Sequence, residues 1–319
     1  MDSTILFLPE LILIASILAV PAIYIATNST KSYSICSNIS LAASLLVVIL
    51  FWYSPDSVSF DKSSSSYVIY DHFVISDFSQ LFKVIFLLSA LSVSIISSSY
   101  FKEEEPHQAE YYVLLLSSAL GMLITASAND FLTIFVGIEL SAFSSYGLVA
   151  FRKTDDKSTE AGAKYLLIGA FSSALTLYGI SLLYALTGSV TFEGVNAFLT
   201  GIDNGVIDGD FSELIFISSL FIIAGLGFKI AVVPFHAWAP DVYEGAPTPV
   251  TALLAAASKA MGFVALFKVF IFTLEPFSDE WSLVLGIIAL VSMTIGNLAA
   301  LSQKDLSLIH ISEPTRLSV

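Results

Sequence analysis

Seven ionisable side chains lie within long apolar runs of this 319-residue sequence. In chain order they are Glu10, Lys83, Glu139, Lys164, Lys229, Lys259 and Lys268. A lysine or an acid at the centre of a membrane-spanning helix costs about 2.5 to 3.5 kcal/mol on insertion scales, so such residues usually face a wet protein interior. Carboxylates and amines both bind and release protons, and burial and nearby charges tune how readily they do so. The pattern therefore indicates proton transfer inside a membrane.

Glu139 lies in the middle of the apolar run from Phe131 to Phe151, and Lys164 follows one short loop later. Consecutive helices joined by a short loop are usually neighbours, so an ion pair between Glu139 and Lys164 is feasible. Glu139 is predicted to exchange protons with a lysine, and a purely structural salt bridge is the alternative. Lys164 is either part of a proton route from the inner face or an anchor whose amine reaches the membrane surface.

Lys229 stands near the end of a run that glycines interrupt, and several prolines follow it closely. A broken helix at membrane depth is tolerated only where it lines protein or water, so this segment is the best candidate for a transport site. Lys259 occupies the centre of the next apolar run, where we predict a proton relay; a permanently neutral buried amine is the alternative. His236, between the two lysines, either relays protons near neutral pH or caps the broken helix.

The remaining three buried ionisable residues are predicted to have structural roles. Lys83 and Lys268 lie near the outer ends of their apolar runs, and we expect both to be anchors whose amines reach the membrane surface. Glu10 lies near the outer end of the first run, and we expect it to be structural.

The composition fits a membrane protein and excludes several other classes. Hydrophobic residues make up 56% of the chain and charged residues 13%, so lipid is the expected solvent for most of its surface. The net charge of -14 arises from acids between the apolar runs, and 13 scattered Lys and Arg residues do not form the basic patch that nucleic acid requires. The single cysteine, Cys36, cannot form an internal disulfide. The sequence contains no zinc-protease, nucleophile-elbow or Walker motif.

We predict an all-α polytopic bundle with about nine spanning helices, because a bilayer core about 30 Å thick needs roughly 20 apolar residues per helix. Backbone polar groups in lipid must be satisfied internally, and the alternating pattern of a membrane barrel is not present. The predicted spans are Ile5–Ala26, Ile35–Trp52, Leu81–Tyr100, Tyr111–Ala128, Phe131–Phe151, Ala161–Leu186, Leu214–Val233, Pro249–Phe272 and Trp281–Leu301.

Basic residues between the spans indicate how the chain is oriented. With the N-terminus outside, Lys62 is the only basic residue in the outer loops. The inner loops then contain Lys31, Lys102, Arg152, Lys153, Lys157 and Lys304. Cytoplasmic loops are enriched in Lys and Arg, so we predict an N-terminus on the outer side.

The segment from Phe228 to Thr251, with Ser258-Lys259 after it, resembles a signature of the antiporter-like membrane subunits of respiratory complex I. Residues 243–251, Tyr-Glu-Gly-Ala-Pro-Thr-Pro-Val-Thr, are most similar to the subunit N branch of that family, the NADH:quinone oxidoreductases. Glu139 in its apolar run supports the resemblance, which extends from Leu8 to Asp305.

The resemblance implies a proton-pumping module with two inverted repeats of helices, each containing a broken helix, and this chain contains the first repeat. By that pattern Glu139 and Lys229 would form the interacting acid–amine pair. Lys259 would be the central relay, and Lys164 would belong to the inner inlet.

The resemblance also implies a subunit of a translocase, without redox chemistry or a cofactor of its own. NAD, FMN, iron–sulfur clusters and quinone would belong to the assembled complex, where quinone reduction drives the pumping. The partners would be other membrane subunits of complex I and the lipid bilayer, and the location would be the bacterial inner (plasma) membrane.

Two other functions remain open. One is a subunit of a multisubunit cation/proton antiporter or of a membrane-bound hydrogenase, both of which are related in fold. The other is a structural spacer that links pumping subunits, whose buried ions are only architectural.

The end of the chain differs from the rest. Residues 306–316 resemble the translation of a transposase adapter used in sequencing libraries. We therefore expect one antiporter-like transmembrane domain over residues 1–305, the N-terminal portion of a longer protein, and a non-native tail over residues 306–319. His310 and Glu313 lie in that tail and are given no functional role.

Overall fold

The computed structural model describes residues 6–27, 30–53, 66–69, 72–101, 107–207, 209 and 211–302. The α-helices in these ranges are α1 (Leu8–Thr27), α2 (Thr30–Tyr53), α3 (Asp77–Tyr100), α4 (Gln108–Ser127), α5 (Phe131–Val149), α6 (Asp156–Thr187), α7 (Phe192–Asp203), α8 (Ser212–Ile230), α9 (Trp238–Gly245), α10 (Thr248–Leu253), α11 (Lys259–Leu266) and α12 (Ser278–Ser302). The other elements are β1 (Ser66–Ile69), β2 (Phe73–Ser76), the π-helical segments η2 (Leu254–Ser258) and η3 (Phe267–Thr273), and the 3-10 turn η4 (Glu275–Phe277). Lys62, Lys102, Lys304 and the predicted tail after Asp305 lie outside the described residues.

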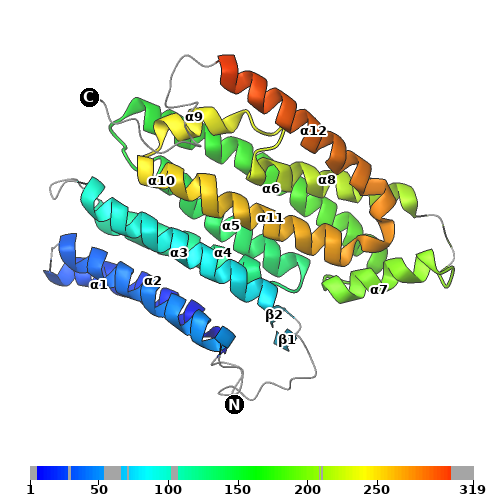
Figure 1. Cartoon of the computed structure of the whole chain (residues 1–319), viewed down its shortest axis with the longest axis horizontal. Helices are drawn as coiled ribbons and strands as arrows, with labels where there is room; N and C mark the ends of the chain where they lie inside the picture. Colours follow the sequence, from blue (N-terminus) through cyan, green and yellow to red (C-terminus); the bar gives the residue numbers. More distant parts are fainter. Residues whose placement is uncertain are drawn as a thin grey trace.

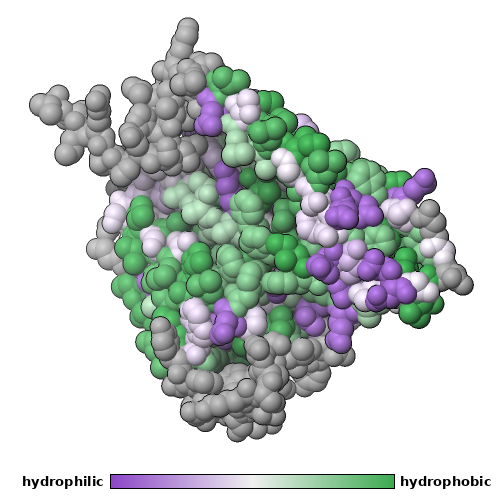
Figure 2. All heavy atoms as spheres, turned by 45° about the vertical axis from the view of Figure 1, so that its right-hand side comes forward, coloured by the Kyte–Doolittle hydropathy of each residue, from purple (hydrophilic) through white to green (hydrophobic). Residues whose placement is uncertain are grey.

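The predicted all-α membrane bundle is confirmed. Within the described ranges, nine helical segments are long and apolar enough to cross a membrane. One of them, Thr248–Thr273, is built from α10, η2, α11 and η3 in succession. Large apolar side chains such as Leu18, Ile25 and Leu167 lie on the surface of the bundle, where they are 71%, 83% and 71% exposed. In Figure 2, apolar side chains cover much of the middle of one face, and hydrophilic ones gather toward one side.

Several predicted helix boundaries were wrong by a few residues. The helix predicted to begin at Leu81 begins at Asp77, because Ser76 and Ser79 cap its start with reciprocal hydrogen bonds. The helix predicted to begin at Ala161 begins at Asp156, where the Asp155 carboxylate accepts a hydrogen bond from the Lys157 amide. Polar capping turns lie outside the apolar run, so hydropathy alone cannot locate them.

Helices α4 and α5 approach each other closely through small residues. A Cβ atom at Gly121 of α4 would lie only 2.5 Å from the backbone nitrogen of Ser141 and 2.6 Å from the carbonyl oxygen of Gly137, both on α5. Small residues allow membrane helices to pack at short range, where dispersion contacts replace the hydrophobic effect. This contact fixes the stretch of α5 that contains Glu139.

The predicted broken helix lies between α8 and α9. Helix α8 ends at Ile230, and Ala231 takes the left-handed conformation with φ 58. Helix α9 begins at Trp238, whose indole nitrogen donates across the break to the carbonyl oxygen of Phe228 at 3.0 Å. That oxygen also accepts from the Ala231 amide at 3.1 Å. Figure 1 shows α8 and α9 following each other along the bundle. The helix predicted to run to Val233 therefore stops three residues earlier.

The bundle has two ends that differ in structure (Figure 1). One end, called the hairpin end, carries the antiparallel pair β1–β2, helix α7 and η4. A bridge between Phe73 and Ala128 joins the hairpin to the end of α4. The other end, called the α9 end, carries α9 and the start of α6, and these two helices contact each other.

The close contact between α4 and α5 is expected to be sensitive to volume. Gly121→Val should destabilise the protein by about 1 to 3 kcal/mol, because overpacked side chains force the two backbones apart. The thermal unfolding midpoint of the detergent-solubilised protein measures this. Gly286→Val on α12 is the matched control, because a Cβ there meets no described atom within 4 Å. Equal unfolding midpoints for the two variants would contradict the assigned contact.

Candidate functional site

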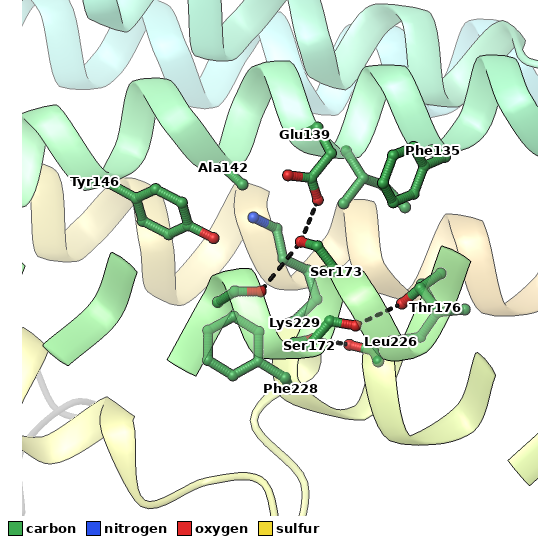
Figure 3. Close-up of a pocket in the computed structure, with 13 residues that line it drawn as sticks. Phe135, Glu139, Ala142, Tyr146, Ser172, Ser173, Thr176, Leu226, Phe228 and Lys229 are labelled. Atoms are coloured by element: carbon green, nitrogen blue, oxygen red, sulfur yellow. Dashed lines mark hydrogen bonds between the residues drawn. The ribbon is translucent and has the colours of Figure 1, made fainter. Parts of the chain in front are cut away.

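Glu139 and Lys229 line one small cavity between α5, α6 and α8. Figure 3 shows the carboxylate and the ammonium directed into the same space, with the Ser173 hydroxyl beside them and Tyr146 at one side. The cavity volume is about 20 Å³. A cavity of that volume has room for about one water molecule. The structure therefore brings together the acid and the amine that the sequence predicted to interact.

The two groups share the cavity without a direct hydrogen bond between them. Glu139 Oε1 accepts a hydrogen bond from Ser173 Oγ at 2.5 Å. Lys229 is only 4% exposed, and its Nζ finds no hydrogen-bond partner among the described residues. A buried ammonium without a partner is costly, and water with two to four polar neighbours is the usual way to satisfy such a group. The geometry fits one water molecule bridging Lys229, Glu139 and Ser173.

Small side chains and the helix break place Lys229 at this cavity. Ser172 of α6 donates from its hydroxyl to the carbonyl oxygen of Gly225 on α8 at 2.8 Å. A Cβ at Gly225 would lie 2.9 Å from the carbonyl oxygen of Ser172, so α6 and α8 are in close contact here. Lys229 lies in the last turn of α8, and the break begins two residues later.

Lys259 stands at the junction of η2 and α11, on a helix that contacts α8. A Cβ at Gly262 of α11 would lie 3.4 Å from Cβ of Lys229, so the stem of Lys229 packs against that helix. Lys259 Nζ lies 5.5 Å from the centroid of the Tyr243 ring, a cation–π contact. Burial raises the pKa of Tyr243 to about 12, so this ring stays neutral at physiological pH. Lys259 is therefore half-buried beside α9, next to the break.

Lys164 does not pair with Glu139, although α5 and α6 are neighbours as predicted. Its Nζ lies 2.5 Å from Asp241 Oδ2 and 2.7 Å from Glu160 Oε1, and its side chain is 44% exposed. Nearby, Lys157 Nζ lies 2.6 Å from Glu244 Oε1. The pair with Glu139 was feasible by loop length, but Lys164 instead pairs with Asp241 on α9 and with Glu160 one turn earlier on α6.

A charged cavity of about 150 Å³ opens between α6 and α9 at the α9 end. Lys157, Glu160, Lys164, Asp241 and Glu244 line it. It is far larger than the cavity at Glu139, and its polar lining suits water.

His236 lies in the loop of the break and is half-buried. Its carbonyl oxygen accepts from the Ala239 amide at 3.0 Å, a backbone contact that does not depend on the histidine side chain. No side chain among the described residues caps the start of α9, so the capping interpretation stays a prediction. Its ring nitrogen Nδ1 is buried and makes no hydrogen bond within the described part of the chain, so the relay interpretation stays a prediction.

The predicted roles of Lys83 and Lys268 as surface anchors were wrong. Lys83 is 2% exposed and Lys268 is 4% exposed. Lys83 Nζ lies 2.6 Å from Glu10 Oε1, and Lys268 Nζ donates to the carbonyl oxygens of Ala126 and Ala128 at 2.7 and 2.6 Å. Position along a span gives the depth of a residue but not the direction of its side chain, and here neighbouring helices close the path to the surface. The opposite charges of Glu10 and Lys83, each near the same end of its span, were the signal for this pair.

Comparisons with known proteins show the family to which this chain belongs. A family model described as NADH:quinone oxidoreductase/Mrp antiporter, TM, matches residues 128–309. NADH-quinone oxidoreductase subunit N of Desulfitobacterium hafniense is 44% identical over 231 residues, which are 72% of this chain and 45% of that protein. F(420)H(2) dehydrogenase subunit N of Methanosarcina mazei is 37% identical over 92% of this chain and 58% of its own length. The chain spans about half the length of the curated relatives it matches.

The fold is also that of one chain in a solved respiratory complex. A chain of respiratory complex I from Thermus thermophilus, solved with bound aureothin, superposes with a TM-score of 0.75 at 28% identity. The superposition covers 95% of this chain and 60% of that one.

The buried Glu10–Lys83 pair is expected to be a strong determinant of stability. Glu10→Gln should destabilise the protein by about 3 to 5 kcal/mol, because removing one partner leaves an uncompensated buried charge. The double variant with Lys83→Met should recover much of that loss. Thermal unfolding in lipid nanodiscs measures both. Glu244→Gln serves as the control, since the Glu244–Lys157 pair is 52% and 70% exposed and such pairs contribute about 0 to 1 kcal/mol. A Glu10→Gln loss no larger than that of the control would refute the buried pair.

Proposed function

Because the chain belongs to the NADH:quinone oxidoreductase/Mrp antiporter family of membrane proteins, we propose that it is a proton-translocating membrane subunit of an NADH:quinone oxidoreductase. The observation that carries this proposal is Lys229, a buried amine at a helix break that shares a water-sized cavity with Glu139. Such an arrangement binds a proton without locking it in a direct ion pair. Intramembrane ionisable residues that face a cavity are usually part of an ion pathway.

In the proposed mechanism, the attraction between Glu139 and Lys229 determines whether Lys229 holds or releases its proton. Two unit charges about 4 Å apart interact by about 4 kcal/mol at an effective dielectric of 20, which is enough to change proton occupancy by several orders of magnitude. When a charge on a neighbouring subunit draws Glu139 away, Lys229 loses that stabilisation and releases its proton. When Glu139 returns, Lys229 binds a proton again.

Lys259 is the proposed acceptor of the released proton. It lies on α11, against which the stem of Lys229 packs. Helix α8 ends at Ile230, so the backbone that follows Lys229 beside α11 is not a continuous helix. The contact with Tyr243 holds the Lys259 amine near the break without neutralising it. His236 is the further candidate relay, because its buried Nδ1 finds no partner in the described residues.

Protons are proposed to enter at the α9 end. Lys164 lines the charged cavity there, beside Asp241 and Glu244, and water in it would reach the start of α6. The basic loop residues Arg152 and Lys153 come shortly before the start of α6, which lies at this end, and this supports assigning it to the inner side and the N-terminus to the outer side.

The whole complex is proposed to supply what this chain does not contain. Under this proposal NAD, FMN, iron–sulfur clusters and quinone act in other subunits, and the present subunit is the translocase part. Its partners are further membrane subunits in the bacterial inner membrane. Exposed apolar residues along α12, such as Leu283, Leu290 and Leu298, offer a surface for neighbouring helices or lipid.

A related cation/proton antiporter is the second candidate, because the family description also names the Mrp antiporters. A membrane-bound hydrogenase subunit belongs with it as a related transporter, and a non-pumping spacer is the remaining alternative. The spacer predicts that the Glu139 and Lys229 charges are dispensable for transport, which separates it from the other functions.

Neutral replacements in the cavity should uncouple proton transport from electron transfer. Glu139→Gln and Lys229→Met, in the complete subunit within its assembled complex in sealed vesicles, should each lower protons pumped per quinone reduced. The initial pumping rate should fall at least about tenfold, because roughly 1.4 kcal/mol of lost stabilisation already changes an equilibrium tenfold.

Glu213→Gln, an exposed acid in the first turn of α8, is the control and should pump normally. Dye-monitored acidification together with quinone reduction gives the ratio. Undiminished pumping by both cavity variants in a complex that assembles would support the spacer and end the proposal.

A further inference from the structure

A second group of buried ionisable side chains lies toward the hairpin end, apart from the Glu139 cavity. It consists of Glu10 of α1, Lys83 of α3 and Lys268 of η3, which are 6%, 2% and 4% exposed. Lys83 donates to Glu10 Oε1 at 2.6 Å. Lys268 binds the carbonyl oxygens at the end of α4 instead of a carboxylate.

Helix α3 packs directly against the segment that carries Lys268. The Phe78 ring, five residues before Lys83, lies 6.5 Å from the Phe267 ring and 5.6 Å from the Phe272 ring, measured between centroids. Phe267 and Phe272 stand on either side of Lys268 in the chain. These ring contacts place Lys83 and Lys268 on segments that pack against each other. The three ionisable groups therefore form one cluster.

The charges of this cluster do not balance when all three groups are ionised. Glu10 neutralises Lys83, and no carboxylate in the described ranges pairs with Lys268. The end of α4 offers Lys268 a partial negative charge of about half a unit. Loss of one proton from Lys268 removes the excess charge, and the neutral amine still donates to the carbonyl oxygens of Ala126 and Ala128. The fold is thus compatible with two protonation states of Lys268.

Unpaired polar atoms surround the same cluster. Glu10 Oε2, Gln80 Oε1 and Ser127 Oγ are buried and have no hydrogen-bond partner among the residues described. Gln80 lies one helical turn before Lys83, and Ser127 stands between the two carbonyl groups that hold Lys268. An unmet buried polar atom costs about 1 to 3 kcal/mol, and internal water usually removes that cost. These atoms mark positions where water would connect the cluster.

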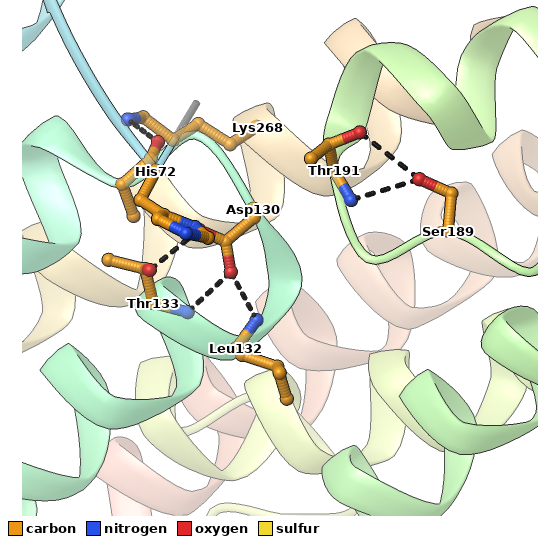
Figure 4. Close-up of polar contacts among 8 residues, drawn as sticks. His72, Asp130, Leu132, Thr133, Ser189, Thr191 and Lys268 are labelled. Carbon is orange, nitrogen blue, oxygen red and sulfur yellow. Dashed lines mark hydrogen bonds and ion pairs between the residues drawn. The ribbon is translucent and has the colours of Figure 1, made fainter. Parts of the chain in front are cut away.

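Ionisable groups continue from Lys268 to the surface. Asp130 follows Ala128 by two residues, is 1% exposed, and caps α5 through the amides of Leu132 and Thr133. Its Oδ2 lies 3.0 Å from Nδ1 of His72, whose side chain is 56% exposed. Figure 4 draws Lys268, Asp130 and His72 in one view, with the hydrogen bonds from Leu132 and Thr133 to Asp130 dashed.

We propose that Glu10, Lys83 and Lys268 form a second proton-binding site, from which Lys268 releases its proton toward the hairpin end past Asp130 and His72. On release, an N–H bond of the Lys268 ammonium breaks, the electron pair stays on nitrogen, and the proton leaves on water. The net charge of the cluster falls from about +1 to 0. Glu10 and Lys83 stay ionised and hold the cluster together.

Lys259 is the group from which the second site is refilled. It precedes Lys268 by nine residues on the same helical run, a rise of about 13 Å at 1.5 Å per residue. The inference rests on the proposed function, because only a proton-translocating chain would fill and empty such a site repeatedly.

Replacing Lys268 with arginine distinguishes a role in proton exchange from a purely structural role. Arginine keeps a positive charge and donors for the two carbonyl oxygens, but it cannot be deprotonated in proteins. Lys268→Arg, in the complete subunit within its assembled complex, should pump protons at least about tenfold more slowly while quinone reduction and assembly persist. Lys153→Arg, an exposed lysine outside both clusters, is the matched control and should pump as the unmodified complex does.

A second variant covers the case in which arginine is too large for the site. Lys268→Gln is smaller, keeps an amide donor for the carbonyl oxygens and has no proton to exchange, so it should show the same loss. If Lys268→Arg pumps normally, or if only Lys268→Gln assembles and it pumps normally, the second site is refuted.

Glu139→Gln measured in parallel shows which proposal has failed. If it loses pumping while Lys268→Arg pumps normally, only the second site is wrong. If it too pumps normally, the proposed function is wrong.

Discussion

The cost of holding a charge in hydrocarbon is the constraint on which this structure depends. Every buried ionisable side chain must find a counter-charge, a backbone carbonyl, an aromatic ring or water. Glu10 and Lys83 meet the requirement with a direct ion pair, and Lys268 meets it with the carbonyl groups that end α4. Lys229 differs from them, because its ammonium reaches a cavity and binds none of the described groups. Lys229 can therefore pass its proton to water in the cavity, whereas Lys268 keeps its bonds to the carbonyl groups whether it is protonated or neutral.

The helix break is the structural feature that makes the position of Lys229 possible. Near the end of α8, the carbonyl oxygen of Phe228 accepts from the Ala231 amide and also, across the break, from the indole of Trp238. The stacked rings of Tyr165 and Trp238, 4.7 Å apart between centroids, join α6 to the start of α9. The break therefore interrupts the helix between α8 and α9, while aromatic packing holds α9 in a fixed position against the bundle.

The sequence predicted the membrane bundle, the number of spans and the broken helix, because each depends on strong local signals. Length and hydropathy mark the spans, and glycine and proline mark the break after Lys229. The motif from Phe228 to Thr251 pointed to the family that the comparisons support. It also led to the association of Glu139 with Lys229, which the structure brings to one cavity.

The directions of individual side chains were not predictable in the same way. Lys83 and Lys268 lie at depths where an amine can reach the surface, and only tertiary packing shows that α1 and the end of α4 enclose them. A pair between Lys164 and Glu139 was thought feasible, but one of the two partners of Lys164, Asp241, lies 77 residues away on α9. Long-range partners such as these depend on how helices pack, and a single sequence carries little information about that.

The protonation state of Lys229 during turnover tests the central claim most directly. With lysine labelled by nitrogen-15 in the intact complex, solid-state magnetic resonance distinguishes an ammonium nitrogen from an amine nitrogen, and Lys229→Arg identifies its signal. The account predicts that Lys229 changes between the two forms when NADH and quinone are supplied, and stays in one form at rest. A Lys229 signal that remains in a single form throughout turnover would contradict it.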